Sequence, residues 1–188
     1  MNTNKTTKKE SWGKFIFDVI VMTTITLGIF FLLLRFVISN DRVSGASMQP
    51  NFEDNDRLVT WRNFSPKYND VVVLRAPKTP QDVPGAFYVK RIIGLPGDTI
   101  VSKNDQMYIN GRLLPEPYLN NHFKKADNVA GEPFTTNFTY KVPQGYYFVM
   151  GDHRDISRDS RFFGPVKRSA LIGKVVFRYY PFNKIQSY

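Results

Sequence analysis

A serine surrounded by small residues is the first candidate for covalent chemistry. Ser47 lies in the stretch VSGASMQP, residues 43–50. Gly45 and Ala46 would let another backbone approach Ser47 closely, because neither carries a large side chain. A serine hydroxyl becomes an effective nucleophile only when a nearby base takes its proton. Most serines in such surroundings belong to simple turns, so the case for Ser47 depends on finding its base.

Lys90 is the strongest candidate for that base. It lies in the β-branched and aromatic run AFYVKRII, where strand alternation would place Lys90, Tyr88 and Ile92 on one face. Burial among apolar neighbours would lower the lysine pKa and let the neutral amine accept a proton. A lysine that protects a sheet edge from aggregation would have the same local sequence. Serine–lysine pairs are a known variant of the catalytic triad, and His153 is the alternative base.

A third cluster, GDHRDISRDSR at residues 151–161, alternates carboxylates with guanidinium groups. These charges could neutralise one another in a rigid loop, or the segment could be a solvated surface loop. The acids at positions 152, 155 and 159 do not fit a calcium-binding EF-hand. His122 and His153 are too few to indicate a metal site, and the absence of cysteine excludes thiolate catalysis and cysteine-ligated metals. We therefore expect no metal and no organic cofactor.

An apolar segment near the N-terminus predicts a membrane anchor. Residues 15–38 would form a helix of about 36 Å at ~1.5 Å per residue, enough to cross a hydrocarbon core of roughly 30 Å. The segment exceeds the ~7–15 apolar residues of a removable signal peptide, although Ser44-Gly45-Ala46 resembles a cleavage site and keeps processing as an alternative. Lysines in residues 1–14 predict a cytoplasmic N-terminus and an extracytoplasmic domain beyond residue 38.

The rest of the chain indicates β-structure. The whole chain has 188 residues, of which 42% are hydrophobic, and this composition excludes a wholly disordered protein. Short runs rich in β-branched and aromatic residues, each bounded by turn residues, occur at 57–61, 71–75, 86–93, 98–102, 146–150 and 171–180. Asn110-Gly111 predicts a hairpin. We expect a mainly β fold with an antiparallel sandwich or barrel-like sheet.

Residues 103–140 differ from their surroundings, because they are rich in Asn, Pro, Lys and Thr. They indicate an inserted subdomain or a long loop, and a surface excursion without a role is the alternative. The net charge of +10 is compatible with attraction to anionic lipid or polymer. No zinc-finger, RNA-recognition or basic-helix pattern accompanies this charge, so we do not expect a nucleic-acid partner.

Taken in order, the three motifs resemble those of bacterial type I signal peptidases, in the single-span form of Gram-positive members. The motifs are Gly45-x-Ser47-Met48-x-Pro50, Tyr88-Val89-Lys90-Arg91-x-x-Gly94-Leu95-Pro96-Gly97-Asp98 and Gly151-Asp152-x-Arg154-x-x-Ser157-x-Asp159-Ser160-Arg161. Each is weak alone, but their order behind a membrane span makes coincidence improbable. The resemblance covers essentially the whole chain, and residues 103–140 match only in place and length.

The resemblance implies roles for individual residues. It matches Ser47 to the nucleophile, Lys90 to the general base, Ser157 to the serine that orients the lysine amine, Asp159 with Arg91 and Arg161 to a salt-bridge set behind the site, and Met48 and Val89 to residues that line substrate pockets. The sequence departs from the family pattern at Asn51-Phe52, where Thr-Leu is frequent, and at His153, where Asn is usual. Gly45 stands where Gram-negative members often have a serine that donates to the oxyanion, so the second oxyanion donor is unassigned.

The resemblance also implies an architecture and an activity. It divides the chain into a catalytic β-domain, residues 39–98 and 144–188, and an inserted β-cap, residues 99–143. The implied enzyme removes signal peptides from exported preproteins after a small-x-small motif, through an acyl-enzyme and without a cofactor. Two alternatives stay open: a non-catalytic relative that assists assembly of surface structures, and a self-cleaving cytoplasmic repressor with a similar site. The membrane segment argues against the repressor.

Overall fold

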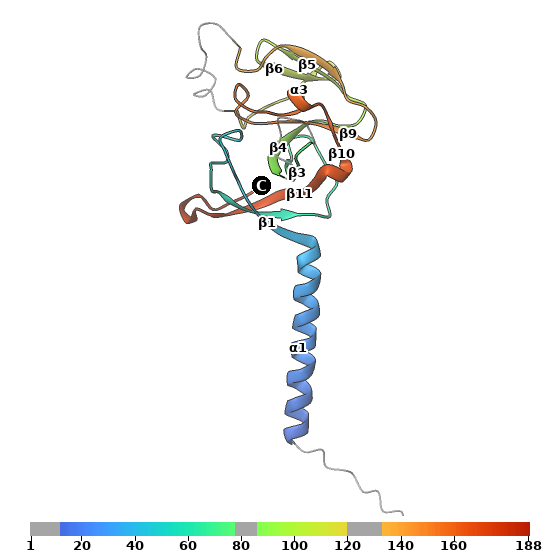
Figure 1. Ribbon diagram of the computed structural model, residues 1–188, viewed down its shortest axis with the longest axis vertical. Helices are drawn as coiled ribbons and strands as arrows, with labels where there is room; N and C mark the ends of the chain where they lie inside the picture. Colours follow the sequence, from blue (N-terminus) through green and yellow to red (C-terminus); the bar gives the residue numbers. More distant parts are fainter. Residues whose placement is uncertain (1–11, 78–85, 120–132) are drawn as a thin grey trace, which may run out of the picture. The chain divides into compact units, whose positions relative to one another are not determined.

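The structure is a computed structural model that describes residues 12–77, 86–119 and 133–188. It divides into two units that meet in sequence between Val37 and Ile38, and each is described by itself. The first contains helix α1 (Trp12–Val37), drawn in blue in Figure 1. None of its side chains is buried, and it is long and apolar enough to cross a membrane. The helix begins three residues before the predicted span of 15–38 and ends one residue before it.

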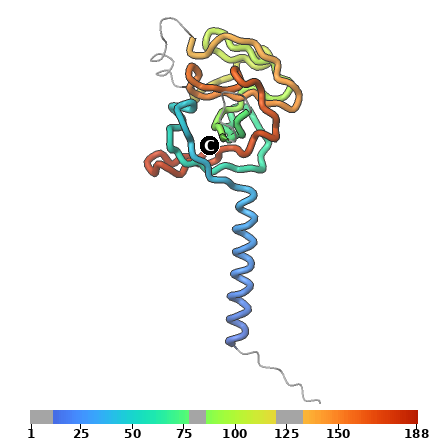
Figure 2. The backbone as a smooth tube through the Cα atoms, viewed as in Figure 1, coloured from blue at the N-terminus to red at the C-terminus, as the bar shows by residue number. Residues whose placement is uncertain are grey.

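The second unit contains a large antiparallel sheet. Within the described residues its strands are β1 (Ile38–Arg42), β2 (Arg57–Trp61), β3 (Val71–Arg75), β4 (Phe87–Gly94), β9 (Tyr146–Met150), β10 (Val166–Lys167), β11 (Leu171–Tyr180) and β12 (Gln186–Ser187). They pair in the order β1-β2-β11-β3-β4-β9-β10, and β12 adds to β11. The late strand β11 thus lies between early strands, as the red segment beside the cyan ones shows in Figure 2. Register shifts along β11 bend the sheet.

A smaller antiparallel sheet is formed from residues between β4 and β9. It has the order β7-β6-β5-β8 and contains β5 (Thr99–Lys103), β6 (Gln106–Ile109), β7 (Arg112–Leu113) and β8 (Phe138–Lys141). The predicted hairpin is confirmed: Asn110 and Gly111 join β6 to β7 with φ angles of 51° and 78°. Positive φ at both central residues is what a two-residue hairpin turn of this kind requires.

Three apolar clusters hold the second unit together. The first packs Val43, Met48 and Phe52, around Ser47, against Leu58 of β2, Val71 and Val73 of β3 and Val175 of β11. The second lies between the two sheets and joins Ile93, Phe148 and Met150 to Ile100, Met107, Ile109 and Val142. The third packs Val72, Leu74, Ile92, Val149, Val166 and Leu171 together, with Tyr88 at its edge. Strand β4 contributes to all three clusters, because Val89 borders the first, Ile93 is in the second and Ile92 is in the third.

The expected fold class is confirmed, and so are most of the strands. β2, β3, β9 and β11 have the predicted bounds, while β4 and β5 each lie one residue later than predicted. The sequence did not predict β1, β8, β10, β12 or the short helices α3 (Ser160–Phe163), η1 (Arg168–Ala170) and η2 (Phe182–Lys184). β1 reads ISNDR, which has no β-branched or aromatic pattern, and it forms because it pairs along its whole length with β2. His122 lies outside the described residues.

The packing between the two sheets predicts the effect of Ile100→Ala. Ile100 is fully buried, and its Cδ1 occupies the space that a side chain on Gly94 would need. Removing its methylene and methyl groups should lower the free energy of unfolding by about 2–5 kcal/mol. Chemical unfolding of the full chain in detergent, followed by near-UV circular dichroism, measures the change.

The matched control is Ile185→Ala, since Ile185 is 53% exposed. It should change the free energy of unfolding by no more than about 0.5 kcal/mol. Equal losses in the two variants would contradict the shared core between the sheets.

Candidate active site

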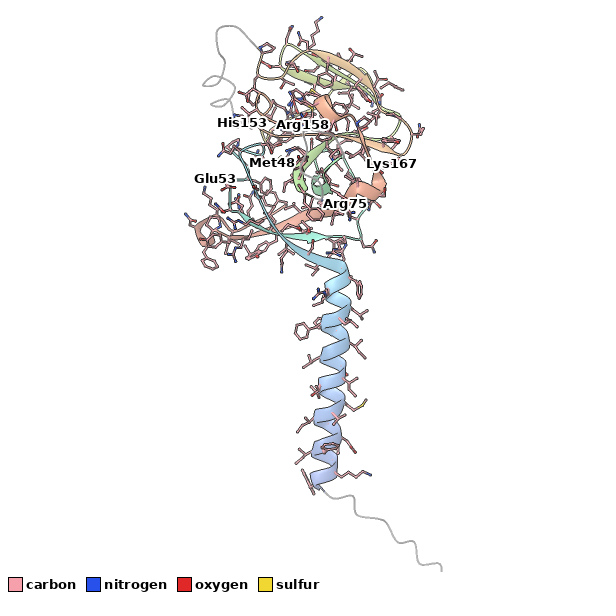
Figure 3. The ribbon with its side chains drawn as sticks, viewed as in Figure 1. Met48, Glu53, Arg75, His153, Arg158 and Lys167 are labelled. Carbon is pink, nitrogen blue, oxygen red and sulfur yellow. The ribbon has the colours of Figure 1, made fainter. Side chains whose placement is uncertain are left out.

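Ser47 lies on a turned segment between β1 and β2 that is fixed from both sides. The backbone N–H of Phe52 donates to the carbonyl of Met48 at 3.0 Å, and the Gly45 N–H donates to Asp54 Oδ1 at 2.9 Å. Met48, labelled in Figure 3, is 1% exposed and anchors the segment in the first apolar cluster. Gly45 has φ +85°, a conformation that favours glycine. The hydroxyl of a partly exposed Ser47 is therefore presented from a rigid base.

Lys90, on strand β4, contacts the Ser47 hydroxyl. Its Nζ donates to Ser47 Oγ at 2.6 Å, and the residue is only 3% exposed. Lys90 is on β4, opposite Val72 of β3, and its Nζ lies 5.5 Å from the centre of the Tyr88 ring. The sequence predicted this shared face of Tyr88 and Lys90, and the structure brings Ser47 to the same place.

Burial lowers the pKa of Lys90 from 10.5 to about 8, because desolvation penalises the charged ammonium. The carboxylates of Asp159 and Asp152 oppose this effect, since negative charge favours the protonated amine. The guanidinium of Arg161 acts in the same direction as burial. A pKa of about 8 leaves a usable fraction of neutral amine near physiological pH.

The loop after β9 packs directly on the serine segment. The His153 N–H donates to the carbonyl of Ser47 at 3.1 Å. A Cβ on Gly151 would lie 2.4 Å from that carbonyl oxygen and 2.1 Å from Ser157 Oγ, which is closer than real Cβ contacts allow. Only glycine at position 151 therefore permits the loop to approach Ser47 as it does.

Ser157 is brought to the site but without the hydrogen bond that the sequence predicted. It is 1% exposed and lies against Gly151, with its N–H donating to the His153 carbonyl at 3.0 Å. Its Oγ makes no hydrogen bond within the described part of the chain, whereas Lys90 Nζ donates to Ser47. A buried hydroxyl at this position is available to accept a bond from the lysine amine, so its orienting role stays a prediction.

Two separate ion pairs replace the single salt-bridge set that was expected. Arg161 Nε and Nη2 each donate to Asp159 at 2.8 Å. Asp159 is fully buried, accepts the Gly151 N–H at 3.0 Å and caps the N-terminus of α3. Arg91 is paired with Asp152 instead of Asp159. Its Nε donates to Asp152 Oδ1 at 2.8 Å and its Nη2 donates to Asp152 Oδ2 at 2.6 Å. Both pairs are bidentate, a geometry that fixes orientation as well as charge.

Asp152 is therefore a site residue that sequence reasoning missed. Its place beside Gly151 in the third motif was the available signal, but three acids in that motif could equally have met Arg91. Asn51 Nδ2 also donates to Asp152 Oδ2 at 2.9 Å, which ties the serine segment to the same pair. Asn51 stands at a position where the sequence departs from the family pattern.

His153 contributes its backbone to the site, and its side chain turns elsewhere. Its Nε2 lies 3.3 Å from Asp155 Oδ1, and its ring lies against Phe134 with 6.4 Å between centroids. The group in hydrogen-bond contact with Ser47 Oγ is Lys90. The geometry thus favours Lys90 over His153 as the base.

The second unit also has a surface pocket, but that pocket is separate from Ser47. A surface pocket of about 500 Å³ is lined by Arg75, Phe163 and Lys167 among others, but by neither Ser47 nor Lys90. Arg75 and Lys167 are labelled in Figure 3. In the described residues no group of three or more metal-ligating side chains gathers in one place. The chemistry available at the site is that of a hydroxyl, an amine and backbone N–H groups.

Comparison with known proteins agrees with this site. The family model described as signal peptidase, peptidase S26, matches residues 16–180. Signal peptidase IB of Staphylococcus aureus (strain COL) is 34% identical over 185 residues, which cover 92% of this chain and 94% of the relative. Signal peptidase I of Bacillus licheniformis is 38% identical over 192 residues, covering 98% and 96%.

A solved structure is also similar. The crystal structure of a signal peptidase I from Enterococcus faecalis V583 superposes with a TM-score of 0.52 at 37% sequence identity, and the match covers 59% of this chain and 97% of that one. With the family model covering most of the chain and relatives above 30% identity along nearly its full length, this chain belongs to the signal peptidase family, peptidase S26, and is a serine endopeptidase that removes signal peptides.

Proposed function

We propose that the chain cleaves signal peptides with a serine–lysine dyad, in which Ser47 is the nucleophile and Lys90 the general base. The observation that carries the proposal is the 2.6 Å contact between Lys90 Nζ and Ser47 Oγ at a nearly fully buried lysine. Only the neutral amine can take the serine proton, and burial supplies the lowered pKa that this requires.

The reaction proceeds in two halves. Neutral Lys90 takes the Ser47 proton as Oγ attacks the scissile carbonyl, and the resulting oxyanion is held by the Ser47 backbone N–H. Lys90 then gives its proton to the leaving amine as the peptide bond breaks, which leaves an acyl-enzyme. A water molecule, deprotonated by Lys90, attacks the ester carbonyl. As the bond to Ser47 Oγ breaks, Lys90 returns the proton to Oγ, which restores the hydroxyl and the neutral amine and releases the signal peptide with its new carboxylate. Ser157 Oγ, buried beside the site, directs the amine.

The substrate binds as an extended strand, with small side chains at the first and third positions before the cut. Met48 and Val89 are the neighbours of the nucleophile and of the base, and both belong to or border the same apolar cluster. Val89 is half-buried and would line the pocket for a small side chain, whereas Met48 is 1% exposed and would support that pocket from within the cluster. A strand added beside a catalytic strand would gain main-chain hydrogen bonds without any demand on sequence.

We further propose how the chain is arranged across the membrane. Residues 1–14 face the cytoplasm, residues 15–38 span the bilayer, residues 39–98 and 144–188 form the catalytic domain, and residues 99–143 form its cap. The small sheet, with strands between Thr99 and Lys141, corresponds to that cap. Because Ser47 lies only nine positions after Ile38 in the sequence, the tether keeps the nucleophile near the membrane surface, where preproteins are held by their own signal helices.

The dyad predicts the effect of Ser47→Ala and Lys90→Ala on cleavage. Each should lower kcat by at least about a thousandfold, because members of a catalytic unit fail together. Mass spectrometry of a purified preprotein incubated with the full chain in detergent measures both the rate and the position of the cut. The native chain should cut after a small-x-small motif.

The controls are Ser169→Ala and Lys167→Ala, which make the same changes at exposed positions. They should cleave at the native rate. If Lys90→Ala cleaves as well as the native chain, another base operates and His153 is the next residue to replace. If the native chain cleaves none of several preproteins, the non-catalytic alternative gains the support that this proposal loses.

The lowered pKa of Lys90 predicts the pH dependence. Protonated Lys90 cannot act as a base, so kcat/KM should rise about tenfold per pH unit on the acid side and level off near pH 8. Initial rates between about pH 6 and 9, with the folded state checked at each pH, give the profile. A midpoint near 6.5, the ordinary pKa of histidine, would instead indicate His153.

The close approach of Gly151 predicts that Gly151→Ala is strongly impaired. The added methyl group must push apart the Ser47 carbonyl and Ser157, so kcat should fall roughly 100-fold. Gly28→Ala is the matched control, since nothing lies within 4 Å of a Cβ at that position. Native-like cleavage by Gly151→Ala would mean that the loop can withdraw from Ser47 without consequence.

A further inference from the structure

A short segment outside both sheets reaches into the loop behind the dyad. Residues 116–118, which follow β7, are here called the latch. The Glu116 carboxylate forms an ion pair with Arg154 of the 151–161 loop, and their side chains are 7% and 0% exposed. The Tyr118 hydroxyl donates to the same carboxylate at 2.8 Å. None of these contacts was expected from the sequence, which gave this region only as an insertion or a loop.

Arg154 connects the latch to the 151–161 loop, because its side chain binds both Glu116 and Gly151. Its Nε donates to the Gly151 carbonyl at 3.0 Å, while its Nη2 is directed at Glu116 and lies 3.4 Å from the Tyr118 hydroxyl. A guanidinium without solvent contact needs a compensating charge nearby, because an unpaired buried charge is strongly destabilising. Glu116 supplies that charge and so fixes the side chain that holds Gly151.

Tyr118 makes a second connection, to the serine segment. Its carbonyl accepts from Asn51 Nδ2 at 2.8 Å, and the same amide donates to Asp152 at 2.9 Å. Its ring lies 3.8 Å from the guanidinium carbon of Arg91, which is bound to Asp152. The latch thus contacts three parts of the site: strand β4, which carries Lys90, the segment that carries Ser47, and the 151–161 loop.

We propose that Glu116 and Tyr118 are positioning residues for cleavage, acting through Arg154 and Gly151 on the geometry of Ser47 and Lys90. The inference rests on the proposed serine–lysine mechanism. Its physical basis is the tight contact at Gly151, where even a small displacement of the loop moves the Ser47 carbonyl bound by the His153 N–H. A displacement of about 1 Å at reacting groups can cost about 100-fold in rate.

The test compares Glu116→Gln, Tyr118→Phe and Glu116→Asp in the full chain in detergent, on a peptide that spans a signal-peptide cleavage site. Glu116→Gln should lower kcat about 10- to 100-fold and leave KM within about twofold, because the latch does not touch the proposed pockets at Met48 and Val89. Tyr118→Phe should act in the same direction but more weakly. Glu116→Asp keeps the charge and should recover part of the lost kcat.

The matched control is Glu53→Gln, since Glu53 forms an exposed ion pair with Lys184 and is 49% exposed. It should cleave at the native rate, because exposed pairs contribute little. Thermal unfolding of every variant separates a loss of folded protein from a loss of geometry. Rates are compared only at temperatures at which each variant is fully folded.

A second readout follows Ser47 directly, by mass-spectrometric detection of its labelling with a serine-reactive phosphonate. Slow labelling of folded Glu116→Gln, together with the kcat loss, supports the latch. Native kcat and native labelling in Glu116→Gln overturn it, as does a kcat loss that only follows the unfolded fraction. Equal labelling of the native chain and of Ser47→Ala would instead overturn the serine–lysine mechanism, so the two failures are distinguishable.

Discussion

The desolvation of one lysine amine is the constraint on which the rest of the site depends. Lys90 acts as a base only if its pKa falls towards the working pH, and burial on β4 provides that fall. The carboxylates of Asp152 and Asp159 nearby work against it, since they favour the ammonium. Pairing Asp159 with Arg161 offsets part of this effect, because the guanidinium at hydrogen-bond distance also lowers the pKa of Lys90. The ion pairs thus keep the loop rigid and also keep the amine available.

The need to keep Lys90 desolvated also explains why the loop after β9 packs so closely against the Ser47 segment. Water must be excluded from Lys90 without a bulky group between the amine and Ser47. Gly151 allows the loop backbone to pack against the Ser47 carbonyl, and the His153 N–H binds that carbonyl. Asp159 holds the same glycine through its N–H. The wall of the site is therefore backbone, which excludes solvent while leaving Ser47 partly exposed to substrate.

The sequence was informative where local pattern decides structure. Alternation in a β-branched run placed Lys90 on a buried face, and the turn residues beside the strands located most of their ends. The sequence was uninformative about ion-pair partners, because these depend on which side chains the folded chain brings together. Nothing in the spacing of the acids in the 151–161 loop distinguishes Asp152 from Asp159 as the partner of Arg91, because both can reach it only after β4 and β9 have paired. Glu116 likewise occurs among polar residues and prolines, so its burial becomes evident only from the position of Arg154.

The topology shows why an inserted segment can take part in the site. The chain leaves the large sheet at the end of β4 and returns in β9, which is the neighbouring strand, with Arg91 opposite Met150 and Ile92 opposite Val149. The two ends of the insertion are therefore adjacent, and its length is unconstrained by the sheet. Lys90 and the Gly151 loop lie at the other end of this strand pair, where Arg91 is opposite Met150, so an inserted segment reaches them only by folding back along the two strands. Residues 116–118 fold back in this way, because they contact Arg91 of β4 and Arg154 of the 151–161 loop, and they do so without interrupting a strand of the large sheet.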